Sequence, residues 1–205
     1  MTDIRKYLPL ILLALGAVLV FSMCGSYNSA VTKDENVKKA WSQVENQYQR
    51  RADLIPNLVK TVQAFADQER EIFVRVSEAR ARVGQIKVDP SDPESLKKFE
   101  QAQQEVGSAL SRLLVVAENY PQLKSDANFR DLQAQLEGTE NRITVARKRY
   151  IDSIQQYNVL VRQFPVNLTA MVFGYKTKPQ FSVENEQAIS TAPKVDFGRP
   201  GDAKK

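Results

Sequence analysis

Residues 41–59 read WSQVENQYQRRADLIPNLV, an amphipathic stretch that runs into a proline. Proline lacks a backbone N–H and fixes its φ angle, so it suits the first turn of a helix and is disfavoured in the interior. We therefore expect Pro56 to open a new helix at a corner, with Asp53 accepting N–H groups at the helix N-terminus. The apolar spacing continues in one heptad register through Pro56, so the alternative is a single long helix that is kinked there.

Four stretches carry apolar residues at spacings of three and four, which is typical of amphipathic helices. They cover residues 27–54, 56–88, 91–120 and 129–164. Pro121 and Pro165 end the third and fourth stretches, and Ser91 with Glu94 forms a capping-box pattern at the start of the third. No segment alternates at period two, so we expect no sheet. Because such faces must bury one another, the predicted fold class is all-α: a single N-terminal transmembrane helix, an elongated antiparallel four-helix bundle and a flexible C-terminal tail.

The N-terminal stretch is apolar enough for a membrane anchor. Residues 7–24 are uncharged, and about 18 such residues are just enough for a helix to cross a bilayer. Arg5 and Lys6 precede them, and by the positive-inside rule they keep the N-terminus in the cytoplasm. The predicted parts are a cytoplasmic N-terminus (1–6), a single-pass transmembrane helix (7–24), a bundle outside the cytoplasm on the periplasmic side (25–175) and a disordered tail (176–205).

Two other interpretations of the N-terminus stay open. Cys24 is followed by Gly25-Ser26 at the end of the apolar run, as in a lipoprotein signal that anchors the chain through its cysteine. Met23 is a poor fit to such a signal, which carries a small residue at that place. The third interpretation is an ordinary cleaved signal. Under all three the body leaves the cytoplasm, and under the first two it stays tethered to a membrane.

The chain changes character after Pro165. Residues 166–175 are apolar enough for a short helix or a docked segment. The tail that follows mixes Pro, Ser, Gly, Asn and charges without periodicity, which favours a solvated, disordered segment. Phe181 and Phe197 are the aromatic residues in it that are candidates for docking.

The composition excludes most enzyme classes. The chain has 29 Lys and Arg against 24 Asp and Glu, no histidine and one cysteine. Basic residues alternate with acidic ones, so no nucleic-acid surface is indicated. The histidine and cysteine counts exclude the usual zinc sites, Ser-His and Cys-His catalysis and an internal disulfide. Ser95 and Lys98 have the spacing of a Ser-Lys dyad but open an amphipathic helix. We therefore expect no enzyme and no cofactor.

Several short motifs are specific only in combination. They are Tyr27-Asn28, Ala40-Trp41, Arg50-Arg51-x-Asp53-Leu54-Ile55-Pro56-Asn57-Leu58-Val59, Glu78-Ala79-Arg80, Glu118-x-Tyr120-Pro121-x-Leu123-Lys124, Glu140 with Arg147, Tyr157-Asn158 and Phe164-Pro165-x-Asn167. Together they resemble the LemA family over nearly the whole chain. The resemblance implies a membrane-tethered helical bundle without an established enzymatic activity. Asp67-Gln68-Glu69 departs from the family pattern, in which a His-Glu pair is common at this place.

Several charged residues fall on or beside the apolar stripes. Arg51 and Glu69 occupy positions on the apolar stripes. Four more charged residues lie beside other stripes: Arg80, Glu118, Glu140 and Arg147. Because buried charges are costly unless they are paired, we predict a polar network that fixes the register of the helices. Glu140 and Arg147 are one heptad apart, too far for a direct bridge, so their partners should lie on other helices. The alternative role for these residues is contact with a ligand or partner.

The predicted function is a non-enzymatic scaffold at a cell-envelope membrane. The N-terminal helix binds membrane lipid, and the body forms a homo-oligomer through helix faces of mixed charge. A tether confines the copies to a plane, so weak lateral contacts suffice. The alternative is an adaptor for a membrane protein or an envelope enzyme.

Overall fold

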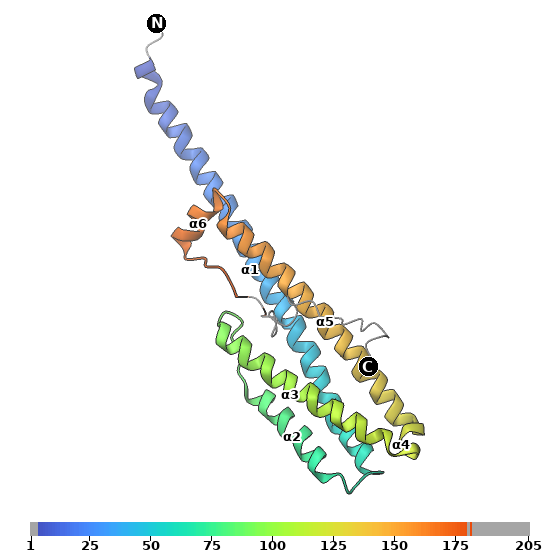
Figure 1. Cartoon of the computed structure of the whole chain (residues 1–205). Helices are drawn as coiled ribbons and strands as arrows, with labels where there is room; N and C mark the ends of the chain where they lie inside the picture. The colour runs from blue at the N-terminus through green and yellow to red at the C-terminus, as the bar shows by residue number, and fades with distance from the viewer. Residues whose placement is uncertain (1–3, 180, 182–205) are drawn as a thin grey trace, which may run out of the picture.

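The computed structural model describes residues 4–179 and Phe181. Within these residues every regular element is a helix, which confirms the all-α class. The helices are α1 (Ile4–Gln63), α2 (Arg70–Gln85), α3 (Pro93–Glu118), α4 (Pro121–Ser125), α5 (Ala127–Arg162) and α6 (Val166–Phe173). Figure 1 shows α1 as the axis of the molecule, with α5 beside it and α2 and α3 packed together against its C-terminal half.

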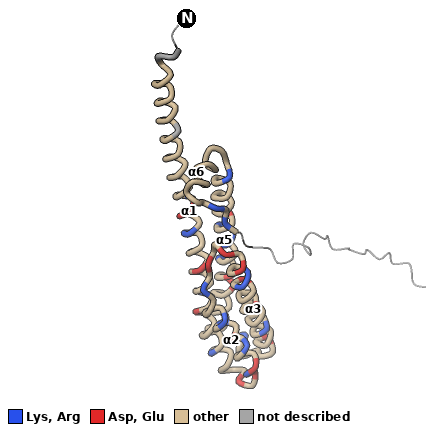
Figure 2. Tube along the Cα trace, turned by 90° about the vertical axis from the view of Figure 1, so that its left-hand side faces the viewer, with Lys and Arg blue, Asp and Glu red and all other residues tan. Residues whose placement is uncertain are grey.

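Helix α1 contains both the predicted membrane span and the first stripe of the body. Its 60 residues make it roughly 90 Å long. The N-terminal part stands clear of the other helices (Figure 1) and carries no charged residue from Tyr7 to Thr32 (Figure 2). By length and composition it is apolar enough to cross a membrane. The helix passes through Cys24, which is exposed, so the predicted boundary at residue 24 is not a structural break.

The predicted corner at Pro56 is wrong, because α1 continues through this residue to Gln63. Proline has no N–H to donate to the carbonyl four residues earlier, which here belongs to Ala52. The Nε of Arg80 on α2 donates to that Ala52 oxygen at 2.9 Å. A side chain from another helix thus replaces the missing backbone donor. Asp53 caps no helix, and its Oδ1 instead accepts a hydrogen bond from Gln49 Nε2 at 2.8 Å.

The second predicted helix is also wrong in its bounds. The chain turns at residues 64–69, and α2 is 16 residues long. The predicted start of the third helix, at Ser91, is one residue too early. The N-cap of α3 is Asp92, whose side chain accepts hydrogen bonds from the backbone N–H groups of Glu94 and Ser95 at 3.1 and 3.2 Å. Ser91 instead donates its backbone N–H to Asp89 at 2.8 Å. Pro93, in the first turn, fits the helix start.

The later helices follow the sequence pattern closely. Asp126 caps α5 by accepting from the Phe129 N–H at 2.9 Å, and α5 ends at Arg162 before Pro165. The short helix expected beyond Pro165 is confirmed as α6. Gly174 ends it with a φ of 74°, in the left-handed region that glycine tolerates.

The core consists of two apolar clusters along the body. The proximal cluster, which is nearer the apolar N-terminal segment, joins α1 to α3, α5 and α6, and its largest side chains are Trp41, Tyr48, Phe99, Tyr150 and Tyr157. The distal cluster joins α1 to α2, α3, α4 and α5, and it includes Ile55, Leu58, Phe73, Leu113 and Phe129. On α1 the two clusters are separated by the turn of helix that contains Arg51.

The expectation of a solvated tail is wrong for its first residues. Asn158 on α5 pairs with the backbone of Lys178, accepting its N–H at 2.8 Å and donating to its carbonyl at 2.9 Å. Phe181 is buried, with its ring centre 5.9 Å from that of Trp41 and 5.4 Å from that of Tyr150. The rest of the predicted tail, with Phe197, lies outside the described residues, as do Met1 to Asp3 of the predicted cytoplasmic N-terminus.

Pro56 and Arg80 should be energetically coupled. We expect Arg80→Ala to lower the free energy of unfolding by about 1 kcal/mol, because it leaves the Ala52 carbonyl without its donor. In a Pro56→Ala background the new backbone N–H reaches that carbonyl, so the same change should cost less. Denaturant unfolding of the four variants measures the coupling. Additive effects of the two substitutions would show that Arg80 does not compensate for the proline.

Candidate functional site

A buried guanidinium lies at the boundary between the two core clusters. Arg51, on the inner face of α1, is only 5% exposed. Its Nη1 donates to Glu140 Oε1 on α5. Its Nη2 donates to the side-chain oxygen of Gln103 on α3 and, at 3.2 Å, to the backbone oxygen of the same residue. Three helices therefore meet on one side chain.

A second ion pair lies beside the first. Arg147 Nη2 on α5 donates to the buried Glu100 on α3 at 2.8 Å. The guanidinium carbon of Arg147 lies 4.6 Å from the ring centre of Phe181, and that of Arg51 lies 5.1 Å from the ring centre of Tyr48. Both cations are attracted by the aromatic faces. Burial raises the pKa of Tyr48 above its ordinary value, against the charges of Arg147 and Arg51, so its phenol stays protonated.

We call these four charged residues and Gln103 the polar layer. They line a groove of about 490 Å³. Its two cations and two anions cancel in formal charge and are already paired with one another. Among the residues that the structure describes, no three metal-ligating side chains cluster. What the arrangement does is hold α1, α3 and α5 at one register.

The other charged residues singled out from the sequence lie outside the polar layer. Tyr120, just before α4, accepts from Gln68 Nε2 at 2.7 Å and donates to Glu69 Oε1 at 3.4 Å. These bonds hold the turn between α1 and α2 against the junction of α3 and α4. Pro121 is the first residue of α4, and Glu118 is exposed. Glu69 therefore belongs to the distal end of the molecule.

The remaining motif residues divide between core and surface. Trp41 and Tyr157 are buried in the proximal cluster. Arg50 and Asn57 are exposed on α1. Pro165 follows a cis peptide bond between α5 and α6.

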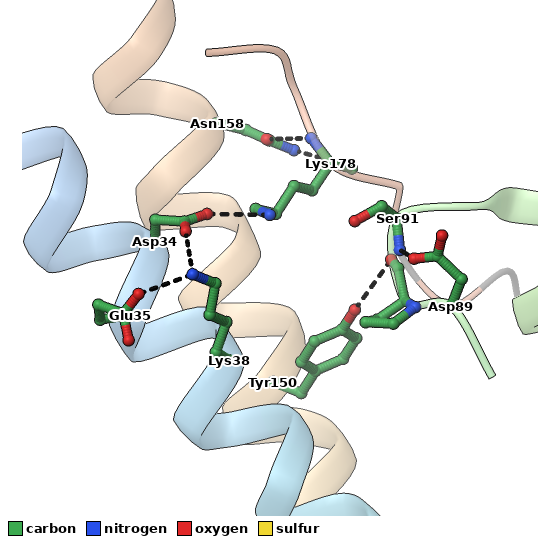
Figure 3. A network of polar contacts seen from close by, with 9 residues as sticks. Asp34, Glu35, Lys38, Asp89, Ser91, Tyr150, Asn158 and Lys178 are labelled. Carbon is green, nitrogen blue, oxygen red and sulfur yellow. Dashed lines mark hydrogen bonds and ion pairs between the residues drawn. The ribbon is translucent and has the colours of Figure 1, made fainter. Parts of the chain in front are cut away.

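A second polar cluster lies beside the proximal cluster, on the side of the apolar N-terminal segment (Figure 3). Lys178 Nζ on the segment after α6 lies 2.9 Å from Asp34 on α1, and Lys38 Nζ lies 3.0 Å from the same carboxylate. Burial would raise the pKa of Asp34, but the hydrogen bonds and charges of Lys178 and Lys38 outweigh it and lower this pKa below its ordinary 3.8. With the Asn158 amide, this ion pair fixes the segment on α1 and α5.

Tyr150 ties the loop before α3 to the same region. Its hydroxyl donates to the Pro90 carbonyl at 3.5 Å (Figure 3). Burial, with a contribution from the charge of Asp89, raises the pKa of Tyr150 to about 12, so the hydroxyl remains a donor at any physiological pH.

Sequence reasoning brought Arg51, Glu140 and Arg147 into one network but missed their partners on α3. Gln103 carried a signal, because it is a polar residue at a stripe position. Glu100 follows Phe99 on the edge of the same stripe, where a charge is easily assigned to solvent. The pairing of Asp34 with Lys178 had no local signal, because the two residues are far apart in the sequence and one lies in a polar tail.

The two partners of the Arg51–Glu140 pair should differ in what their loss costs. The Glu140 side chain is 47% exposed, so in Arg51→Met it can turn to water, and we expect a loss of about 1 kcal/mol in the free energy of unfolding. Glu140→Leu leaves a buried cation and should cost about 3 kcal/mol. The double variant should be more stable than Glu140→Leu alone. Denaturant unfolding followed by circular dichroism tests this order, with the exposed Glu137→Leu as the matched control; a double variant less stable than both single ones contradicts it.

Docking of the Lys178 segment should weaken in acid. Because the folded pKa of Asp34 is lowered, its contribution is complete above the ordinary value of 3.8 and is lost as the pH falls through the folded value. Trp41, the one tryptophan, lies against Phe181 and reports on the segment by its fluorescence. We expect Asp34→Asn to shift its emission to the red already at neutral pH and to flatten the acid-dependent change. Glu35→Gln, which removes a neighbouring carboxylate that does not contact Lys178, is the control, and an unchanged acid response in Asp34→Asn would contradict the assignment.

Comparison with known proteins identifies the family of the chain. The model of the LemA family matches residues 40–197. Two magnetosome proteins of Paramagnetospirillum magneticum, MamQ 1 and MamQ 2, are each 28% identical over 177 residues, and MamQ of Magnetospirillum gryphiswaldense is 29% identical over 174. Each alignment covers 76% of this chain and 64% of the relative, so the chain spans just under two thirds of these relatives' length. Because the family match extends over most of the chain, including Arg51, Pro56, Arg80, Glu140 and Arg147, this protein belongs to the LemA family.

Proposed function

We propose that this protein is a membrane-anchored, non-enzymatic scaffold whose helical body assembles with copies of itself along a cell-envelope membrane. The observation that carries the proposal is the continuity of α1, which is at once the apolar N-terminal span and the central helix of the body. No loop separates the anchor from the core. The body therefore stands on the membrane as one rigid unit.

The arrangement of the helices supports an elongated antiparallel four-helix bundle. Lys33 near the membrane-proximal end of α1 contacts Gln156 near the end of α5. Arg51, farther along α1, contacts Glu140, which comes earlier in α5. The part of α1 from residue 25 to Gln63 has 39 residues, about 58 Å at 1.5 Å per residue. Such a rod presents a large lateral surface relative to its core.

The proposed topology places the N-terminus in the cytoplasm and the body on the periplasmic side. The support is the pair of basic residues, Arg5 and Lys6, directly before the apolar span. We propose that the span is retained, because α1 runs without a break through Cys24 and Met23 is not the small residue of a lipoprotein signal. The tether keeps the copies in one plane and raises their effective concentration.

A groove of mixed charge between α2 and α3 is the surface best suited to self-association. Its volume is about 740 Å³, and its charged lining residues are Arg75, Glu78, Arg82, Glu105 and Arg112. Arg82 and Glu105 form an ion pair of 3.0 Å across it. Charges of both signs on one face allow that face to pair with its own copy. The same groove supports the alternative function, in which a helix of a membrane protein or envelope enzyme binds there and the chain acts as an adaptor.

Site-directed photo-crosslinking distinguishes the two functions. The full-length chain with Cys24→Ser receives one cysteine at Ser108, which lines the groove, and a cysteine-reactive photo-crosslinker is attached there. In native membranes a scaffold should give a series of multimers of this chain. The matched control is Ser42→Cys, an exposed position on α1 that should give monomer. Monomer from both positions contradicts self-assembly, whereas a product with one different protein supports the adaptor.

A further inference from the structure

Helix α6 has an apolar face that points away from the protein. The residues at this face are Leu168, Met171 and Val172, and all are exposed, Met171 by 80%. Phe164, in the turn before the helix, is also exposed, by 79%. The spacing of three and one places Leu168, Met171 and Val172 on one side of α6. The opposite side is buried through Thr169 and Ala170 and packs on α1 and α5. We call this outward side the α6 face.

The sequence around α6 is uncharged from Gln163 to Tyr175. Arg162 precedes this run, and Lys176 and Lys178 follow it. A helix on the surface of a soluble body normally turns polar residues to solvent, so a contiguous apolar face marks a binding surface. Val115 on α3 differs from this face, although it is 61% exposed. It is a single exposed apolar side chain at the far end of the molecule, near α4.

The place of α6 in the fold indicates what covers this face. Tyr27 on α1 lies with its ring centre 4.8 Å from that of Phe173 and 6.1 Å from that of Tyr175. It comes three residues after the end of the apolar span, about 4.5 Å along the helix axis. Figures 1 and 2 show α6 where α1 leaves the other helices and continues alone. The α6 face is therefore at the depth where a bilayer crossed by α1 has its interface.

We propose that α6 lies in the interface of the same bilayer that α1 spans, with the α6 face buried at the boundary between headgroups and acyl chains. This inference rests on the proposed membrane anchor. Tyr27 and Tyr175 are then in the headgroup region, where amphipathic aromatic rings accumulate. Arg162 and Lys176 at the two ends of the apolar run suit the phosphates of lipid headgroups.

Two membrane contacts together fix the orientation of the body, which one anchor alone does not. A single transmembrane helix does not by itself fix the tilt and rotation of the body. These angles are set by packing and by interfacial anchors. A second contact to one side of α1 fixes which side of the body is nearest the membrane. The groove between α2 and α3 then points in a defined direction on every copy.

The test measures the depth of labelled positions in lipid vesicles. The full-length chain with Cys24→Ser is reconstituted in phosphatidylcholine–phosphatidylglycerol vesicles with an environment-sensitive fluorophore on one introduced cysteine. The positions are Met171 on the α6 face, Val18 in the span as the positive control and Val115 as the matched exposed apolar control. We expect blue-shifted emission and loss of most of the intensity to a lipid-borne quencher at Met171 and Val18, and neither effect at Val115.

Each outcome decides a different claim. Quenching at Val18 with a water-like signal at Met171 overturns the interfacial helix and leaves the anchor intact. A blue shift at Met171 without lipid quenching means that protein, such as a second copy, covers the α6 face, and this also overturns a lipid partner. Absence of quenching at Val18 contradicts the anchor itself, and the inference then falls with it.

A charge placed on the α6 face gives an independent check. Leu168→Glu should reduce lipid quenching of a label at Met171, because a carboxylate resists burial among acyl chains. Val115→Glu, the same charge on the control surface, should leave that quenching unchanged. Equal quenching in the Leu168→Glu and Val115→Glu variants would contradict the proposal.

Discussion

The fold depends most on the pairing of one buried cation. An ionised side chain as enclosed as Arg51 is costly to bury unless opposite charge and acceptors surround it. Here the acceptors come from Glu140 on α5 and Gln103 on α3. Apolar clusters above and below this point tolerate small slips between helices, because dispersion and burial are not directional. The guanidinium tolerates no such slip, since a shift of one residue on any of the three helices would leave the buried charge of Arg51 without its partners.

The long axis of the molecule depends on a second satisfied group. Pro56 leaves the Ala52 carbonyl without a backbone donor, and Arg80 supplies one from α2. Because α1 is therefore not stopped at the proline, the distal cluster built on Ile55 and Leu58 belongs to the same helix as the apolar N-terminal segment. Whatever orients the apolar N-terminal segment therefore also orients the far end of the body. This continuity is what makes a role as a rigid scaffold physically reasonable.

The sequence predicted the parts of the fold that local chemistry controls. The stripes of α3 and α5 are regular, and both helices end before the predicted prolines, Pro121 and Pro165. Their aspartate caps, Asp92 and Asp126, were not predicted, although the predicted start of α3 differs by only one residue. The α1–α2 boundary could not be predicted in this way, because the donor that rescues Pro56 comes from a residue 28 positions away from the carbonyl it binds, and the actual turn contains neither proline nor glycine. Within the polar layer, charge on a stripe identified Arg51, while its partners depend on how α3 faces α1. Phe181 was a candidate for docking, but a solvated tail was favoured because composition describes the tail and not the aromatic surface that receives this ring.

The docked tail segment also fixes the orientation of α6. The chain enters α6 from α5 and leaves it toward Lys178, which is tied to Asn158 and Asp34. Phe181 then inserts between Trp41, Tyr150 and the Arg147 guanidinium. Helix α6 is therefore held from both ends by the body, and the polar layer and the docked segment share Arg147. These contacts hold the apolar face of α6 outward, beside the apolar N-terminal part of α1. Its outward direction is part of the native fold, as a built surface for lipid requires.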